Sequence, residues 1–87
     1  MYLLIVYDIN ARRCNKVKSF LREYIFWIQN SVFEGEVTEK EYREIIEGLK
    51  ELTDENEDSV IIFKVRVPEM MEREIIGVEK ASINTIL

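Results

Sequence analysis

An α+β fold with six elements, in the order strand, helix, strand, strand, helix, strand, is predicted by three observations. Residues 2–8 form an unbroken apolar run that ends in an acid, which is typical of a central strand. Segments 11–24 and 38–52 carry apolar residues at helical spacing. Segments 25–37 and 59–67 are rich in β-branched and aromatic residues, as strands are. This order is the split βαβ arrangement of a ferredoxin-like domain, βαββαβ, followed here by an extra C-terminal strand.

Length and composition indicate one small domain with a tail. With 87 residues, 47% of them hydrophobic, the chain can bury only a modest core, so we expect a homodimer. The ferredoxin-like domain is predicted to span residues 1–67, and residues 68–87 form a C-terminal tail for dimerisation. Within the tail, residues 74–78 are predicted to form a strand that adds to the edge of the partner's sheet.

The cellular compartment is predicted from what the sequence lacks. No apolar run approaches the roughly 20 residues of a membrane span, and no pattern of a secretory leader is visible. Cys14 is the only cysteine, which agrees with a reducing compartment, and the absence of histidine removes the usual zinc ligand and general base. We therefore expect a cytoplasmic protein without a membrane partner.

The first helix and the strands after it are predicted from caps and breaks. Asn10 is a favourable N-cap residue. Four apolar residues follow it at helical spacing: Val17, Phe20, Leu21 and Tyr24. The β-rich segment 25–37 is interpreted as two strands that break near Asn30, and Glu34 and Glu36 fit the outward face of the second.

The second helix has the clearest start signal of the chain. Thr38 and Glu41 form a capping box, in which each side chain accepts from the other residue's backbone amide. The apolar stripe of this helix consists of Tyr42, Ile45, Ile46, Leu49 and Leu52. The acidic segment 54–58 is predicted to be a solvated loop, and Pro68 ends the strand that follows it.

Asp8 is the candidate catalytic residue because it ends the first strand. A carboxylate at that point is held rigidly at the rim of the sheet, where ligands of open α/β sheets collect. The basic stretch 12–22 follows directly, and this pairing suggests metal-assisted chemistry on phosphate. The alternative is that Asp8 caps the first helix, although Asn10 lies nearer to the helix start. One carboxylate binds Mg²⁺ poorly, so a two-fold axis that pairs two Asp8 side chains would supply a second ligand.

Charge is distributed unevenly along the chain, whose net charge is −5. Residues 1–33 carry five basic and two acidic residues, hence +3, whereas residues 34–58 carry eleven acidic and three basic residues, hence −8. The acidic total argues against indiscriminate nucleic-acid binding, but a local basic face is what phosphate contacts require. The predicted phosphate-binding face of the first helix consists of Arg12, Arg13, Lys16, Lys18 and Arg22.

Four segments of the sequence resemble the Cas2 family of CRISPR-associated proteins. They are Tyr7-Asp8-Ile9, Asn15-Lys16-Val17, the string from Gln29 to Glu36, and Asp58-Ser59-Val60. The string Ser31-Val32-Phe33-Glu34-Gly35 is the most specific, and the match covers nearly the whole chain. The resemblance implies a ferredoxin-like homodimer that acts as a Mg²⁺-dependent endonuclease on RNA or DNA. It also implies a partnership with the integrase subunit in spacer acquisition.

Site residues follow from the same resemblance. The metal-binding and catalytic aspartate of the family falls on Asp8, with Tyr7 beside it, and Phe33 falls on an aromatic position near the dimer axis. Nucleic-acid contacts are thereby expected from Tyr7, Phe33, Arg12, Arg13 and Lys16. At two positions where the family often has arginine, this chain has Cys14 and Trp27.

Three functions are compatible with the sequence. The first is a metal-dependent endonuclease of single-stranded RNA or double-stranded DNA that uses Asp8 and Mg²⁺. The second is a non-catalytic scaffold that binds the duplex backbone within the integrase complex, with Asp8 unnecessary. The third is a toxin-like ribonuclease of similar fold.

Overall fold

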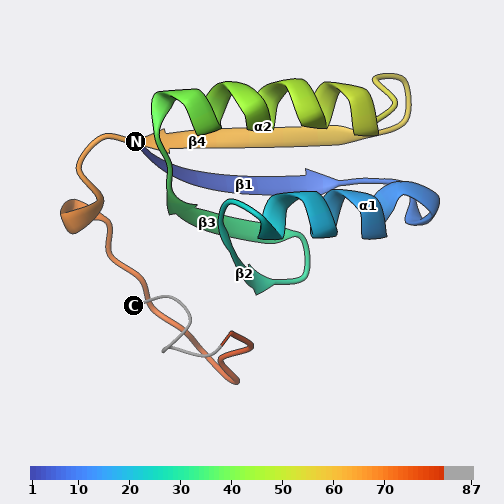
Figure 1. Ribbon diagram of the computed structural model, residues 1–87. Helices are drawn as coiled ribbons and strands as arrows, with labels where there is room; N and C mark the ends of the chain where they lie inside the picture. The colour runs from blue at the N-terminus through green and yellow to red at the C-terminus, as the bar shows by residue number, and fades with distance from the viewer. Residues whose placement is uncertain (82–87) are drawn as a thin grey trace.

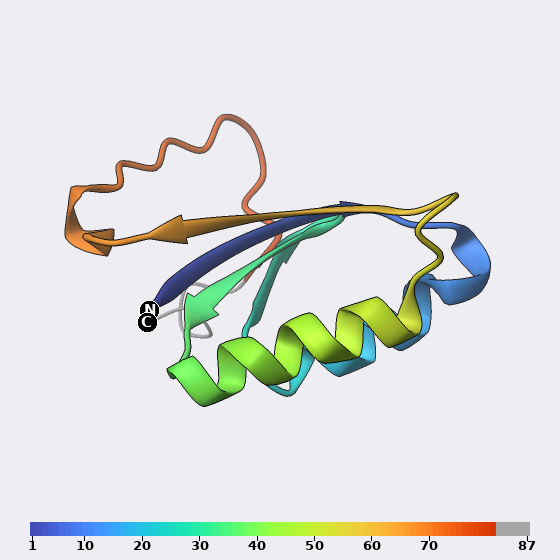
Figure 2. The same ribbon diagram turned by 90° about the horizontal axis from the view of Figure 1, so that it is seen from above.

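Two helices cover one face of a four-stranded antiparallel sheet in the computed structural model, which describes residues 1–81 (Figures 1 and 2). The elements in chain order are β1 (Tyr2–Asp8), α1 (Ala11–Arg22), β2 (Phe26–Gln29), β3 (Val32–Glu36), α2 (Glu39–Leu52), β4 (Ser59–Val65) and the short 3₁₀ helix η1 (Pro68–Met70). The strand order is β2-β3-β1-β4, so β1 is central, as its apolar run predicts. The predicted ferredoxin-like βαββαβ order is confirmed.

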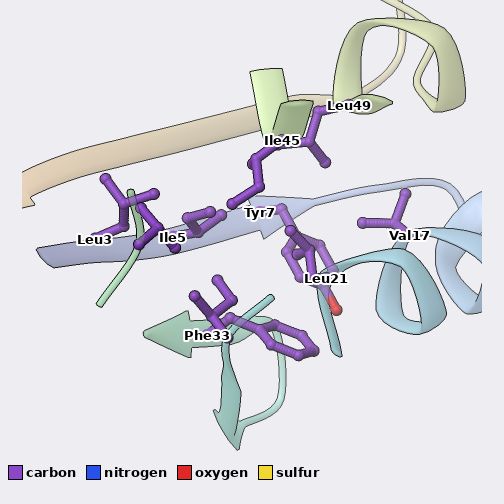
Figure 3. Packing of buried hydrophobic residues seen from close by; sticks show 10 residues of the cluster. Leu3, Ile5, Tyr7, Val17, Leu21, Phe33, Ile45 and Leu49 are labelled. Carbon is purple, nitrogen blue, oxygen red and sulfur yellow. The ribbon is translucent and has the colours of Figure 1, made fainter. Parts of the chain in front are cut away.

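The hydrophobic core lies between the sheet and the two helices. Alternate residues of β1 point into it, namely Leu3, Ile5 and Tyr7, all of them buried. They meet residues of α1, α2 and β3 that are also buried, including Val17, Leu21, Ile45, Leu49 and Phe33 (Figure 3). The other residues of β1 therefore face the side of the sheet that carries no helix, called here the helix-free face.

Local signals in the sequence set the helix starts and the hairpin as predicted. Asn10 caps α1, because its side-chain oxygen accepts from the Arg12 amide at 3.0 Å. Thr38 and Glu41 form the complete capping box of α2. Asn30 adopts a φ of 39° in the turn between β2 and β3, a conformation that asparagine tolerates better than most residues. Trp27 donates to the Asn30 carbonyl at 3.0 Å and so braces the same turn.

The strand predicted at 74–78 does not form in the single chain. Residues 71–81 contain no strand, and the tail lies instead over the helix-free face (Figure 2). The prediction placed this strand on the edge of a partner's sheet, which one chain by itself does not offer. Within the described residues no helix is long and apolar enough to cross a membrane.

Glu34 is buried, although it was predicted to point outward. It lies on the helix-free face of β3 but is 0% exposed, because the tail covers it and Arg73 pairs with its Oε1 atom. Its Oε2 atom has no hydrogen-bond partner within the described residues. Because a buried carboxylate is costly unless it is paired, the Arg73 contact holds the tail against the sheet.

Candidate functional site

Asp8 lies at the end of β1, at the rim of the sheet. It is exposed, and its backbone pairs with Ser59, the first residue of β4. By the alternation of the strand, its side chain shares the helix-free face with Leu4 and Val6. The carboxylate is therefore accessible from the face that the helices leave open. Asn10, not Asp8, caps α1, so the alternative role of Asp8 as the helix cap is excluded here.

The described residues offer Mg²⁺ one carboxylate at this rim. No group of three or more His, Cys, Asp or Glu residues that could hold a metal occurs within residues 1–81. Mg²⁺ is commonly bound through one or two carboxylates together with water and substrate phosphates, and does not need an all-protein cage. Asp8 fits that mode, with the remaining ligands supplied by phosphate or by Asp8 of a second copy.

Some basic side chains of α1 are exposed to solvent, whereas Arg13 forms ion pairs within the chain. Arg12 and Lys16 are exposed, and Arg12 lies in the first turn of α1. Figure 1 shows that α1 begins near the end of the sheet where β1 ends. Arg12 approaches Glu57 at 3.7 Å, a weak contact between exposed groups. Arg13, in contrast, is held by Asp58 and Glu57 through its Nε and Nη2 atoms. Of the residues expected to contact phosphate, Arg12 and Lys16 are thus the available ones at this end of α1.

Tyr7 and Phe33, both expected to contact nucleic acid, lie in the core instead. Tyr7 is 4% exposed and Phe33 0%, and their rings stack with centroids 6.2 Å apart. Burial, with a smaller contribution from Cys14, raises the pKa of Tyr7 to about 12. The direct contacts expected of these two side chains are contradicted by their burial, because alternation turns both rings toward the helices.

Asp58 is a residue that sequence reasoning assigned to a solvated loop, whereas its side chain is only 1% exposed. Its Oδ2 atom accepts from Arg13 Nε at 2.7 Å and from the Asp54 amide at 2.9 Å. Its Oδ1 atom accepts from the Asn10 amide at 2.9 Å and from Arg13 Nη2 at 3.1 Å. The signals in the sequence were its place in the resembling segment Asp58-Ser59-Val60 and its position directly before a predicted strand.

These contacts fix the charge state of both partners. The hydrogen bonds from Arg13, helped by the amides of Asn10 and Asp54, hold the pKa of Asp58 well below its usual range. The same hydrogen bonds raise the pKa of Arg13. At neutral pH the pair is therefore an ion pair with two parallel N–H···O contacts, the stronger kind of such contact.

Fold and rim together define a class of protein: a ferredoxin-like α+β domain with an exposed acid at the end of its first strand and a basic helix directly after it. The family model described as CRISPR associated protein Cas2 matches residues 1–73. The chain therefore belongs to the Cas2 family.

Relatives and solved structures match most or all of the chain. A protein of Pyrococcus furiosus named CRISPR-associated endoribonuclease Cas2 is 55% identical, and the alignment covers 100% of both chains. A protein of Methanocaldococcus jannaschii with the same name is 53% identical over 100% of this chain and 76% of its own. A crystal structure of Cas2 superposes with a TM-score of 0.86 at 37% identity, covering 100% of this chain and 98% of the other. Streptococcus pyogenes Cas2 gives a TM-score of 0.73 at 29% identity, covering 85% of this chain and 99% of its own.

Proposed function

We propose that this chain is a Mg²⁺-dependent endonuclease of a CRISPR system, acting on single-stranded RNA or on double-stranded DNA. The observation that carries the proposal is the exposed carboxylate of Asp8 at the end of a central strand that pairs with β3 on one side and β4 on the other. Relatives named endoribonucleases support RNA as the first substrate to test. A role in spacer acquisition beside the integrase subunit is part of the proposal and rests on the family resemblance.

Asp8 and the basic residues of α1 would have different roles in phosphodiester hydrolysis. Asp8 would hold Mg²⁺ at the rim, and the bound ion would supply an activated water and stabilise the charge that develops on the phosphate. Arg12 and Lys16 would bind the nucleic-acid backbone and set its position relative to the rim. Because neither of these basic residues reads bases, we expect little sequence preference.

We further propose that the active form is a homodimer that packs through the helix-free face. That face exposes large apolar side chains of β2 and β4, and Asp8 lies on it. The most exposed of them on these strands are Ile61, Phe63 and Phe26. A second copy on this face would bring two Asp8 carboxylates toward each other, and so would complete a site that one chain provides only in part.

A cleavage assay with metal removal tests the nuclease proposal. We expect internal cuts in single-stranded RNA or in duplex DNA of matched sequence with Mg²⁺, loss of cleavage after chelation, and recovery on Mg²⁺ addition. No cleavage of either substrate at any Mg²⁺ concentration would contradict the proposal. If that inactive protein still bound duplex DNA and co-purified with the integrase subunit, the scaffold function would be favoured.

The role of the basic face is tested by the salt dependence of binding. Each phosphate contact to duplex DNA contributes about 0.9 to the slope of log affinity against log salt concentration. Replacing Arg12 and Lys16 by glutamine is therefore expected to flatten the slope by about 1 to 2, equally for unrelated sequences. The matched control is Arg43→Gln, an exposed position on α2. An unchanged slope in the double variant would exclude Arg12 and Lys16 as phosphate contacts.

A further inference from the structure

One buried carboxylate, that of Asp58, joins three segments at the rim that carries Asp8. It accepts hydrogen bonds from the Asn10 amide after β1, from Arg13 in the first turn of α1, and from the Asp54 amide in the loop after α2. All four donors lie between 2.7 and 3.1 Å from it. A surface loop that was merely solvated would leave this carboxylate in water, whereas its side chain is 1% exposed.

The geometry connects this carboxylate to Asp8 by two short routes. Asp58 directly precedes Ser59, whose backbone pairs with Asp8 in the ladder between β1 and β4. Asp58 also binds the amide of Asn10, two residues after Asp8. The segment after Asp8 is thus bonded to the Asp58 side chain, and the strand that pairs with Asp8 begins directly after Asp58, which limits the directions that the Asp8 carboxylate can take.

We infer that Asp58 and Arg13 are positioning residues that hold the Asp8 carboxylate at the rim in the orientation needed to bind the metal. The catalytic consequence rests on the proposed nuclease function, whereas the structural consequence does not. The inference also removes Arg13 from the phosphate-binding set, because its Nε and Nη2 atoms are occupied by Asp58 and Glu57. Arg13 then acts through Asp8 rather than on the nucleic acid.

Asp58→Asn tests this inference, with Glu57→Gln as the matched control from the same loop. Asparagine keeps the shape of Asp58 but lacks the charge and one acceptor oxygen, so it cannot satisfy both Arg13 and the two amides. Glutamine at position 57 removes the charge that faces Arg13 and, more weakly, Arg12, but leaves every hydrogen bond to Asp58 in place. Arg13→Lys is a second variant with a milder change, because lysine keeps the charge but not the two parallel contacts.

The first measurement needs no nuclease activity. In Asp58→Asn we expect amide hydrogen exchange at Asn10 to accelerate at least about tenfold and the carboxyl carbon resonance of Asp8 to shift, while exchange in the core of β1 stays unchanged. Arg13→Lys should show the same changes to a smaller extent, and Glu57→Gln neither change. Unaltered exchange at Asn10 and an unaltered Asp8 resonance in folded Asp58→Asn would overturn the inference, whether or not the protein is a nuclease.

The second measurement is kinetic. Groups that orient a metal ligand typically change activity by about 10- to 100-fold, so kcat for Mg²⁺-dependent cleavage should fall by that factor in Asp58→Asn. KM and the salt slope of binding should change less than about twofold, because Arg12 and Lys16 are untouched. A raised KM with unchanged kcat would overturn the inference, since it would make Arg13 a phosphate ligand. A wild-type chain without activity would refute the proposed function and leave the exchange measurement to decide.

A third measurement uses acid. The charged groups around Asp58 are Arg13 and, through Arg13, Glu57, with Asp54 in its own loop. Because the pKa of Asp58 is lower in the folded chain than the unfolded value of about 3.9, its stabilising effect is present above that value and is lost as pH falls through the folded pKa. The thermal midpoint of the wild type should therefore fall more between about pH 5 and pH 2 than that of Asp58→Asn. Parallel pH curves would contradict the ion pair.

Discussion

Asp8→Asn is expected to reduce Mg²⁺-dependent cleavage by about a hundredfold or more while leaving the fold and the dimer intact. The substitution removes the charge that attracts the metal but keeps the size of the side chain. Asp8 is exposed, and its role in the ladder with Ser59 is played by backbone atoms, which asparagine also provides. A hundredfold loss corresponds to about 2.7 kcal/mol of transition-state stabilisation.

The matched control for this experiment is Glu47→Gln, which removes one negative charge from an exposed position on α2, in the layer opposite to the helix-free face. Cleavage rates of the wild type, Asp8→Asn and Glu47→Gln are compared under saturating Mg²⁺, after their thermal midpoints have been shown to agree. If Asp8→Asn cleaves as fast as Glu47→Gln, Asp8 has no catalytic role, and any metal must be bound elsewhere.

The fold could be predicted from the sequence because its elements are specified locally. The start of α2 depends on Thr38 and Glu41, three residues apart, and the start of α1 on Asn10 and the amide of Arg12. The central place of β1, between β3 and β4, agrees with its unbroken apolar run, which is typical of a strand in the middle of a sheet. Each of these signals lies within one element, where side-chain spacing decides the structure.

The candidate site was predicted less completely because it depends on contacts between distant residues. Arg13 and Asp58 are 45 residues apart, so their pairing could not be inferred from spacing; Arg13 was assigned to phosphate contacts and Asp58 to a solvated loop. Tyr7 and Phe33 were assigned to nucleic acid from their motifs, although alternation in β1 already places Tyr7 with the core residues Leu3 and Ile5. The structure thus moves Asp58 from the predicted solvated loop into a buried ion pair, and moves Tyr7 and Phe33 from predicted nucleic-acid contacts into the core.

The position of the tail likewise could not be predicted from the sequence. Its pattern at residues 74–78 favours a strand, but a strand forms only where an edge accepts its hydrogen bonds. In the single chain the tail is held instead by the pair between Arg73 and Glu34, two residues that are 39 positions apart. The pattern therefore indicates that residues 74–78 can form a strand, but it does not decide where the tail lies.

Disruption of the helix-free face is expected to convert the proposed dimer to a monomer. Ile61 and Phe63 lie on this face of β4 and are 52% and 50% exposed, so a second copy would bury large apolar side chains here. The double variant Ile61→Glu, Phe63→Glu places two charges in that interface, and burying unpaired charges is strongly unfavourable. We expect the dimer dissociation constant to rise by about a hundredfold or more, measured by light scattering across micromolar concentrations.

The control is Lys64→Gln, on the same strand but on the opposite face, where Lys64 lies over the Tyr42 ring at 4.4 Å. It changes charge without touching the helix-free face, so its dimer should be unaffected. If, as proposed, Asp8 of a second copy completes the metal site, cleavage by the double variant should fall in parallel with the fraction of dimer. A double variant that remains dimeric would move the interface to the strand edges. A monomer that cleaves at the wild-type rate would show instead that one Asp8, with substrate phosphate, is sufficient to hold the metal.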